Sequence, residues 1–574
     1  MPGKFRSLLP ALLWLIASVG HAQQVEVEVL GDYPDLQANA EAFIGKVEGR
    51  SEQRLRRYIP TAERQVMDAL RALGYYQPEI EWEMLEAELP TVLLRVTPGA
   101  PVRIRSVSVT INGPADDDPA FLPVLPEKPA VGDVLNHGHY DALRQTIRNR
   151  ALRLGYFDGQ FATRRLAVDP DQRMADIELV FDSGERYRLG EVQFRGDTQI
   201  GEPLLRQFVT LTPGEEYHAD KVAALNSDLS NSGYFREVLV DANPADAQQG
   251  VIPVKVRLRV RDPRSVSTGI GFSTDVGPRF RGTWREHWIN EMGHRRGAET
   301  ELSGPRQSLS TWYELPLDPP MTDLIRLSAG YQREDIEDVE SERLTLGQQW
   351  QHELDNGWLQ ILSMRWEGER FNISHGRTVT SSLFLPGAGY SKLRADSPLD
   401  PSRGYRLQFD VTGAHRAALS DADILHVGVL LKGLITVADK HRFLGRFQFG
   451  GVATNSFDDV PPSLRFFAGG DQSVRGYGYE TLSPQDSDGS QVGGRYLLVG
   501  SLEYQYSLFK KWRAAVFYDR GNAIDEVFDP LASGAGIGVR WVSPVGPLRL
   551  DIAKGLDPEF GGEWRVHFSM GPEL

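Results

Sequence analysis

Cysteine is absent from the 574 residues of the chain. Its absence excludes structural disulfides, thiolate zinc sites, iron–sulfur clusters and a cysteine nucleophile. Basic residues are also scarce, since 63 Lys and Arg stand against 78 Asp and Glu, a formal net charge of −15. Nucleic-acid binding needs a basic face, so this balance argues against a nucleic-acid partner. Hydrophobic residues make up only 41% of the chain, and this excludes a polytopic helical membrane protein.

The first 22 residues have the organisation of a secretory signal peptide. Lys4 and Arg6 precede an apolar run over residues 8–19, and small residues follow at Gly20 and Ala22. The run is shorter than the ~20 apolar residues of a membrane-spanning helix, so cleavage between Ala22 and Gln23 is predicted. We therefore expect the mature protein to work outside the cytoplasm.

The N-terminal half repeats one local pattern three times. A glycine followed by two aromatic residues, Tyr-Tyr or Tyr-Phe, occurs three times. The first tyrosines are Tyr75, Tyr156 and Tyr234, which are 81 and 78 residues apart. A helical hydrophobic period precedes each glycine, which is placed where a helix C-cap adopts a left-handed conformation. Two extended segments follow each tyrosine. The pattern predicts tandem α/β modules over residues 23–99, 100–185 and 186–263, each with the order strand, helix, helix, strand, strand.

From about residue 264 the helical period disappears and a two-residue alternation replaces it. Apolar residues alternate with polar ones, for example from Tyr405 to Thr412 and from Trp564 to Ser569. We count sixteen such segments, most of them ~9–11 residues long, with Trp and Tyr near their ends, as in membrane-spanning strands. The alternation predicts a 16-stranded antiparallel outer-membrane β-barrel over residues 264–574, in which only every second residue of a strand faces lipid. Six residues follow Phe568, so the end of the last strand is left open.

One connection in the second half, residues 455–494, is exceptionally long. Long connections without secondary structure are usually functional or disordered. This one carries Val474, Arg475, Gly476 and Tyr477 among aromatic and small residues, which indicates an ordered element folded into the barrel lumen. There Arg475 would need a carboxylate partner. The lumen-facing phase offers Glu503, Asp519 and Asp551, with Asp519 as the first choice; the alternative is that Arg475 is a solvated loop arginine.

These motifs resemble those of the BamA/TamA superfamily of outer-membrane assembly and translocation proteins. The match rests on Val474 to Tyr477, Asp400 to Tyr405 and Pro544 to Asp551. The resemblance implies three periplasmic POTRA repeats before a sixteen-stranded barrel. It also implies that the loop arginine docks on a wall motif that maps to Phe517, Tyr518 and Asp519. Three repeats favour the TamA branch of the superfamily.

No catalytic signature is found along the chain. Residues 534–538 read Gly-Ala-Gly-Ile-Gly, but they lack the following helix and acidic residue of a nucleotide site, so small residues on a crowded wall are the better interpretation. His352-Glu353 lacks the second histidine of a zinc protease motif. We expect a protein that is not an enzyme, with no catalytic residue, no cofactor and no metal.

The working hypothesis is a barrel that opens laterally between its first and last strands. Gly269 and Gly271 lie in the first strand, and Gly561 and Gly562 precede the last. Glycines weaken strands, so this seam should be the softest part of the wall. A client strand of an unfolded outer-membrane or autotransporter protein could then pair at the exposed edge, next to the lipid bilayer.

The resemblance to the TamA branch further implies an inner-membrane-anchored, TamB-like partner, which we expect to bind the first repeat. Whether the cargo is protein, phospholipid or both stays open. Two alternatives are kept: a substrate-specific porin with periplasmic docking modules, and a two-partner-secretion-type transporter, which usually has two repeats and a plug helix.

Overall fold

The computed structural model describes residues 24–85, 89–121, 127–196, 198–336, 338–373, 378–543 and 546–570. The predicted signal peptide and its cleavage site at Ala22 and Gln23 lie outside this part of the chain. The chain divides into two compact units. The first comprises residues 1–193, 211–223 and 241–254, and the second comprises residues 194–210, 224–240 and 255–574. No helix among the described residues is both long and apolar enough to cross a membrane.

The N-terminal half contains three three-stranded sheets with one topology. In each, the last strand of the repeat lies between the other two, in the orders β1-β3-β2, β4-β6-β5 and β7-β9-β8. The strands are β1 (Val25–Val29), β2 (Glu79–Leu85), β3 (Thr91–Thr97), β4 (Arg103–Asn112), β5 (Gln160–Asp169), β6 (Met174–Asp182), β7 (Arg188–Arg195), β8 (Phe235–Asp241) and β9 (Val251–Val260). The helices are α1 (Pro34–Ile44), α2 (Glu52–Ala72), α3 (His137–Leu154), α4 (Glu202–Gln207) and α5 (Ala219–Asn231).

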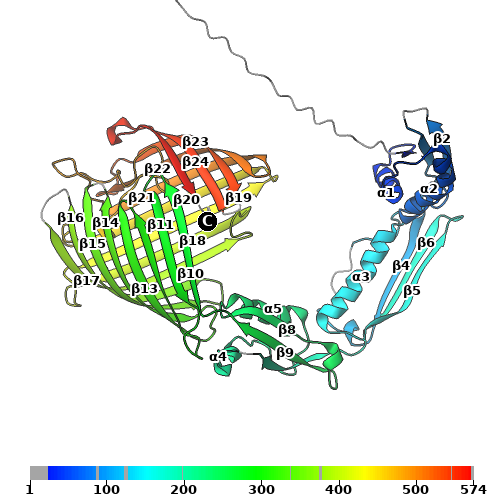
Figure 1. Ribbon diagram of the computed structural model, residues 1–574, viewed down its shortest axis with the longest axis horizontal. Coiled ribbons are helices and arrows are strands. Elements are labelled where there is room, and N and C mark those ends of the chain that lie inside the picture. The colour runs from blue at the N-terminus through cyan, green and yellow to red at the C-terminus, as the bar shows by residue number, and fades with distance from the viewer. Residues whose placement is uncertain are drawn as a thin grey trace, which may run out of the picture. The chain divides into compact units, whose positions relative to one another are not determined.

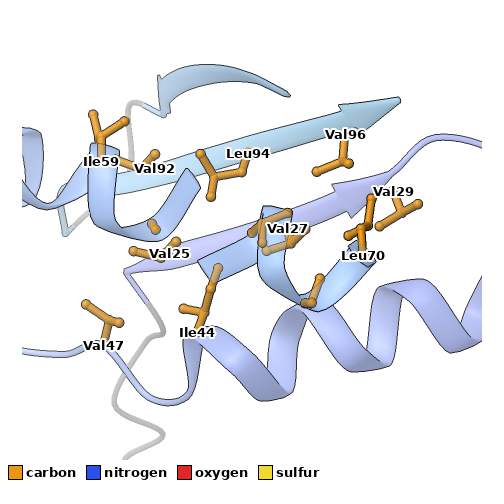
Figure 2. Close-up of a cluster of buried hydrophobic side chains, with 14 of the residues drawn as sticks. Val25, Val27, Val29, Ile44, Val47, Ile59, Leu70, Val92, Leu94 and Val96 are labelled. Carbon is orange, nitrogen blue, oxygen red and sulfur yellow. The ribbon is translucent and has the colours of Figure 1, made fainter. Parts of the chain in front are cut away.

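The first repeat buries one face of its sheet under two helices. Helix α2 places Leu55, Ile59, Val66 and Leu70 on one side, at the three- and four-residue spacing of a helix face. This side packs against the valines of β1 and against Leu94 at the centre of β3 (Figure 2). Each repeat can therefore form a small core of its own.

The repeated glycine and tyrosine have the structural roles that their spacing predicted. Gly74, Gly155 and Gly233 all adopt positive φ, between 80° and 92°, so each supports the left-handed turn after its helix. Tyr156 and Tyr234 are fully buried. The three glycines therefore end their helices, and Tyr156 and Tyr234 belong to the hydrophobic cores.

The second repeat differs from the predicted order. Between β4 and α3 the described residues contain a 3-10 turn, Pro114–Asp116, in place of a first α-helix. Pro114 starts this turn, and Pro119 follows closely. A proline removes a helical hydrogen bond and restricts the residue before it, so Pro119 disfavours the extension of this turn into an α-helix, although α2 accommodates Pro60. The prediction of two α-helices was wrong here.

The second half forms one 16-stranded antiparallel sheet in which every strand pairs with its neighbours in sequence (Figure 1). The strands are β10 (Arg264–Ser273), β11 (Gly277–Glu286), β12 (Arg295–Ser303), β13 (Arg306–Pro316), β14 (Leu324–Ile336), β15 (Val339–Glu353), β16 (Leu359–Ile373), β17 (Val379–Ala395), β18 (Arg403–Ala414), β19 (Ile424–Val437), β20 (His441–Thr454), β21 (Tyr496–Phe509), β22 (Trp512–Ile524), β23 (Ala532–Ser543), β24 (Gly546–Gly555) and β25 (Trp564–Met570). The sheet curls into a nearly closed barrel, whose first and last strands meet at Thr274 and Phe568. The predicted fold class is confirmed.

Within the second unit, part of the third repeat holds the turn between β11 and β12. The hydroxyl of Tyr234 donates to the carbonyl of Gly293 at 2.7 Å. Arg295 lies over the Tyr234 ring, 4.1 Å from its centroid, and its guanidinium donates to the carbonyl of Ser232 at 2.5 Å. A backbone bond from Gly201 to Glu291 adds a further tie. The second strand pair of the barrel is therefore clamped to the chain that precedes the barrel.

Candidate functional site

The candidate site lies inside the barrel, where the long loop between β20 and β21 returns to the wall. Its centre is Arg475, of which only 6% is exposed. The guanidinium grips Asp519 of β22 with two bonds, from Nε at 2.7 Å and from Nη2 at 2.9 Å. The backbone N–H of Arg475 donates to the same carboxylate at 3.1 Å. A planar guanidinium matches a carboxylate in this two-bond geometry.

Two further carboxylates and a second arginine complete the network. Nη1 of Arg475 donates to Glu503 of β21 at 2.8 Å and to Asp551 of β24 at 3.2 Å. Arg540 of β23 bonds the same two carboxylates, with its Nη1 2.6 Å from Asp551 and its Nε 3.0 Å from Glu503. All five side chains are buried or nearly so. Two guanidinium groups therefore share three carboxylates in a water-poor site, where opposite charges attract strongly.

An aromatic ring supports the central arginine from the side. The Arg475 guanidinium carbon lies 3.4 Å from the centroid of the Phe517 ring. The Ser501 hydroxyl donates to Asp519 at 2.6 Å and so orients that carboxylate. A stacked guanidinium gains cation–π attraction while its edges stay free for hydrogen bonds.

Glycines of β23 make room for the loop. A Cβ on Gly534 would lie 1.9 Å from the carbonyl oxygen of Arg475, and one on Gly538 would lie 1.8 Å from Asp551. Gly476 has φ of +97°, and its Cβ would lie 2.4 Å from the backbone nitrogen of Gly555. The Gly-Ala-Gly-Ile-Gly sequence is thus a crowded part of the wall, where Gly534 makes room for the loop backbone and Gly538 for the Asp551 carboxylate.

The neighbours of Arg475 in the loop are buried as well. Val474 and Tyr477 are almost completely buried. The Tyr477 hydroxyl donates to the carbonyl of Ser533 at 3.0 Å and accepts the backbone N–H of Asp557 at 3.2 Å. The structure therefore brings Val474, Arg475, Gly476 and Tyr477 together with the predicted wall residues.

The same loop also reaches the seam of the barrel through Asp471. Its carboxylate lies 2.7 Å from Nδ1 of His567 in β25 and accepts the Thr274 hydroxyl at 3.0 Å. Its backbone N–H donates to Asp275, in the turn after β10, at 2.9 Å. Asp471 is thus bonded to both edges of the seam at once. We call Thr274, Asp275, Asp471 and His567 the seam latch.

The latch histidine has both ring nitrogens engaged. The backbone N–H of Gly476 donates to Nε2 of His567 at 3.0 Å, which leaves Nδ1 as the donor to Asp471. The oxygen and nitrogen atoms of Asp275, Asp471 and His567 lie within 4.8 Å of one another. Both histidine nitrogens are engaged, so hydrogen bonds close the latch.

The predicted seam glycines have several different environments. Gly269 has open space around it, and a Cβ on Gly271 would lie 2.9 Å from Nε of Arg279. Gly561 and Gly562 lie in the turn before β25, where Gly561 has φ of +70° and Gly562 packs against Gly555. The latter pair shapes the turn and lies outside the seam strands.

Sequence reasoning missed Arg540, Asp471 and His567. Arg540 and His567 both belong to the polar phase of their strands, a signal that places them in the lumen without showing what they meet. Asp471 precedes Arg475 by four residues in the loop, and nothing in its local pattern indicates the seam.

Comparison with known proteins identifies the domains. Residues 308–573 match the Omp85 superfamily domain. Residues 26–98 match the POTRA domain TamA domain 1, and residues 187–261 match a POTRA family described as surface antigen variable number repeat. This chain joins POTRA repeats to an Omp85 superfamily barrel. It is an outer-membrane protein, and its POTRA repeats lie in the periplasm.

Curated relatives of this Omp85 chain are named outer membrane protein assembly factor BamA. The protein of Nitratidesulfovibrio vulgaris is 23% identical over 432 residues, 71% of this chain and 54% of the relative. That of Neisseria meningitidis serogroup B is 20% identical and covers 88% of this chain and 72% of its own length. The chain spans about half the length of the first of these relatives. A solved structure, BamA from Haemophilus ducreyi lacking POTRA domains 1–3, superposes with a TM-score of 0.67 at 15% identity, over 82% of this chain and 99% of that one.

We predict that Arg475→Ala releases the loop from the Omp85 barrel wall. The change leaves Asp519 and Glu503 buried with one arginine fewer, and breaking a buried ion pair costs about 3–5 kcal/mol. Limited proteolysis of the loop and the temperature of barrel unfolding on heated gels would measure the effect. Arg475→Lys should be intermediate, because an ammonium cannot form the two-bond grip.

The matched control is Arg416→Ala, which removes an exposed loop arginine that pairs with Asp459. Exposed pairs contribute about 0–1 kcal/mol, so this variant should behave like the wild type. Equal protease sensitivity of the Arg475→Ala and Arg416→Ala proteins would show that Arg475 is a dispensable surface arginine.

We also predict that the seam latch weakens as pH rises from about 4 to about 7 and then levels off. Burial and the charge of Asp471 raise the pKa of Asp275 to about 7 in the closed latch, whereas an exposed aspartate has a pKa near 3.9. The closed state therefore holds a proton that the open state releases, so closure loses up to about tenfold per pH unit within this window. Distances between nitroxides on Pro278→Cys, on the β10 side of the seam, and Glu559→Cys, in the turn before β25, would report closure.

Asp275→Asn removes the titrating carboxyl and should flatten this pH dependence. Asp471 and His567 are the titratable groups that face Asp275 in the latch. An unchanged slope in the Asp275→Asn protein would contradict the assignment.

Proposed function

We propose that this protein is a non-enzymatic assembly factor whose barrel opens between β10 and β25 to pass client chains into the outer membrane. The observation that carries the proposal is the weakness of this one strand junction. Among the described residues, one pair of backbone and hydroxyl hydrogen bonds crosses it. The Thr274 N–H donates to the carbonyl of Phe568 at 3.3 Å, and the Phe568 N–H donates to the Thr274 hydroxyl at 3.1 Å. A tilted ring contact between Phe272 and Phe568 accompanies this pair, with a centroid distance of 6.2 Å.

Other junctions of the wall are far longer. Strands β15 and β16 pair continuously from Val339–Ile373 to Glu353–Leu359. Each ladder hydrogen bond contributes about 0.5–1.5 kcal/mol net, so opening a full ladder costs many times more than opening the β10–β25 junction. An opened seam exposes two strand edges, and edges with unpaired backbone groups accept another extended chain.

The loop couples the seam to the barrel wall. Asp471 bonds both edges of the seam, and Arg475 holds the same loop to β21, β22 and β24 through the carboxylate network. Opening the seam therefore requires the latch to break while the deeper anchor stays in place. This arrangement supports a gate that reopens and recloses without unfolding the loop.

The client class is inferred from the relatives. Proteins named outer membrane protein assembly factor match 71–88% of this chain. We propose outer-membrane proteins, autotransporters included, as clients, with phospholipid as a possible further cargo.

The first repeat supports a finer assignment to the TamA branch. Residues 26–98 match the TamA domain 1 description. We propose that this repeat binds an inner-membrane-anchored, TamB-like protein, so that the pair bridges the periplasm.

Locking the seam with a disulfide should block client insertion. Phe272→Cys combined with Phe568→Cys places two thiols where the rings now meet, and no natural cysteine competes with them. We expect the oxidised protein to lose most client insertion into vesicles and to regain it on reduction. The control is Trp350→Cys with Leu362→Cys, a lipid-facing pair opposite each other in the continuous β15–β16 ladder. Full insertion by the oxidised seam variant would exclude lateral opening.

Deleting residues 24–98 should abolish capture of the inner-membrane-anchored partner but leave the barrel folded. The deletion removes the first repeat with its complete core. From the second repeat's core it takes away the contact of Tyr76, and the buried residues of that core remain. Co-purification from membranes, with heat-shifted mobility of the barrel as a folding control, measures this. Undiminished co-purification would place the contact on another repeat.

A further inference from the structure

The outer face of the barrel carries a groove away from the seam, on the opposite side of the wall from the loop site. Its volume is about 540 Å³, within the range of small-molecule sites. It crosses four neighbouring strands, β19 to β22. The lining includes Leu431, Gly433, Gly445, Phe447, Gly500, Leu502, Tyr518 and Arg520.

The groove exists because three positions in two adjacent rows of cross-strand neighbours are glycines. One row runs Gly433, Gly445, Leu502, and the next row pairs Phe447 with Gly500. These residues share the phase of the exposed Phe447 and Leu502, so they face lipid. The three glycines leave a hollow between large apolar neighbours.

Neither the backbone nor the packing requires glycine at these positions. None of the three has a φ in the left-handed region. A Cβ on Gly433 would meet nothing within 4 Å, and those on Gly445 and Gly500 would meet their nearest atoms at 3.9 Å. Glycine weakens a strand, so three of them in one patch indicate that the space itself is used.

Arg520 stands at the edge of the groove as an uncompensated charge. It lies directly opposite Gly500 in the ladder and is exposed. Its side chain makes no hydrogen bond or ion pair with any other described residue, and its outward neighbours in the two rows are Phe447, Leu502 and Tyr518. A charge on the lipid-facing side of a barrel is costly unless it lies near the interface or meets an opposite charge.

The position of Arg520 along β22 places it in the outer half of the membrane. Strand β10 follows the periplasmic repeats, so β22, the thirteenth barrel strand, starts in the periplasm at Trp512 and ends outside at Ile524. Eight residues separate Trp512 from Arg520, roughly 26 Å along a strand. At a tilt near 40° this is about 20 Å of height, close to the upper limit of an apolar band of ~25 Å. If Trp512 marks the inner interface, the backbone of Arg520 lies about 5 Å below the outer interface, within reach of the headgroups for its long side chain.

We propose that this groove binds one lipid of the outer leaflet, with an acyl chain in the glycine hollow and a phosphate on Arg520. The arginine fork matches phosphate oxygens, and the hollow below it is lined by apolar side chains. The proposed occupant is lipid A, because its phosphate matches the guanidinium and its acyl chains match the apolar hollow. The site is independent of the assembly function proposed above.

Native mass spectrometry of the full chain from phosphatidylcholine nanodiscs that contain lipid A tests the proposal. We expect one retained lipid A per wild-type protein and at least a tenfold loss of retention in Arg520→Gln. Gly445→Leu should have the same effect, because it fills the hollow and its Cβ has room. The control Arg333→Gln removes another outward-facing arginine, one directly opposite Glu342 in the β14–β15 ladder, and should leave retention unchanged.

The possible outcomes are separable. Equal retention by wild type, Arg520→Gln and Arg333→Gln would mean ordinary boundary lipid and would overturn the site. Displacement of lipid A by an equal amount of phosphatidylglycerol would overturn the assignment of the occupant. If Gly445→Leu does not fold, as judged by its mobility on heated gels, the Arg520→Gln comparison still decides.

Discussion

Charge neutralisation inside the barrel is the constraint on which the rest of the second half depends. Glu503, Asp519 and Asp551 come from three different strands and point at one place. Arg540, on the strand between two of them, cannot neutralise all three. The loop supplies the second guanidinium. A buried carboxylate without a partner is expensive, so the wall is complete only when the loop is in position.

The glycines of β23 follow from the same constraint. A guanidinium can reach the wall only if the loop backbone lies almost against it, and any side chain on Gly534 would prevent this. Ion pairing in the lumen thus determines residue size on a neighbouring strand. Glycines destabilise β23, and its hydrogen bonds to β22 and β24 along most of its length offset this loss.

Much of the architecture could be predicted because the membrane imposes a strict period. The sixteen alternating segments counted from about residue 264 correspond to the sixteen strands β10 to β25, the first of which begins at Arg264. The phase of each strand also separated lumen from lipid, and this was enough to select Glu503, Asp519 and Asp551 as partners of Arg475. The structure shows that Arg475 contacts all three, where the sequence argument chose one first.

What the period could not show is which residues meet across the lumen. Strand phase assigns His567 to the interior, but its contact with Asp471 depends on the stagger of the strands and on the path of the loop. The missing α-helix of the second repeat has a local cause, the prolines at 114 and 119, that a search for hydrophobic spacing overlooks. Long-range register and helix-breaking residues are therefore where sequence reasoning stopped.

The clamp of Tyr234 and Arg295 on the β11–β12 turn has a mechanical consequence. It grips the barrel one strand away from β10, the strand that forms one side of the seam. A force on the clamped part of the third repeat therefore acts close to the seam, because only β11 lies between the clamped turn and β10. The other strand junctions have continuous ladders and resist separation, so such a force is concentrated at the seam.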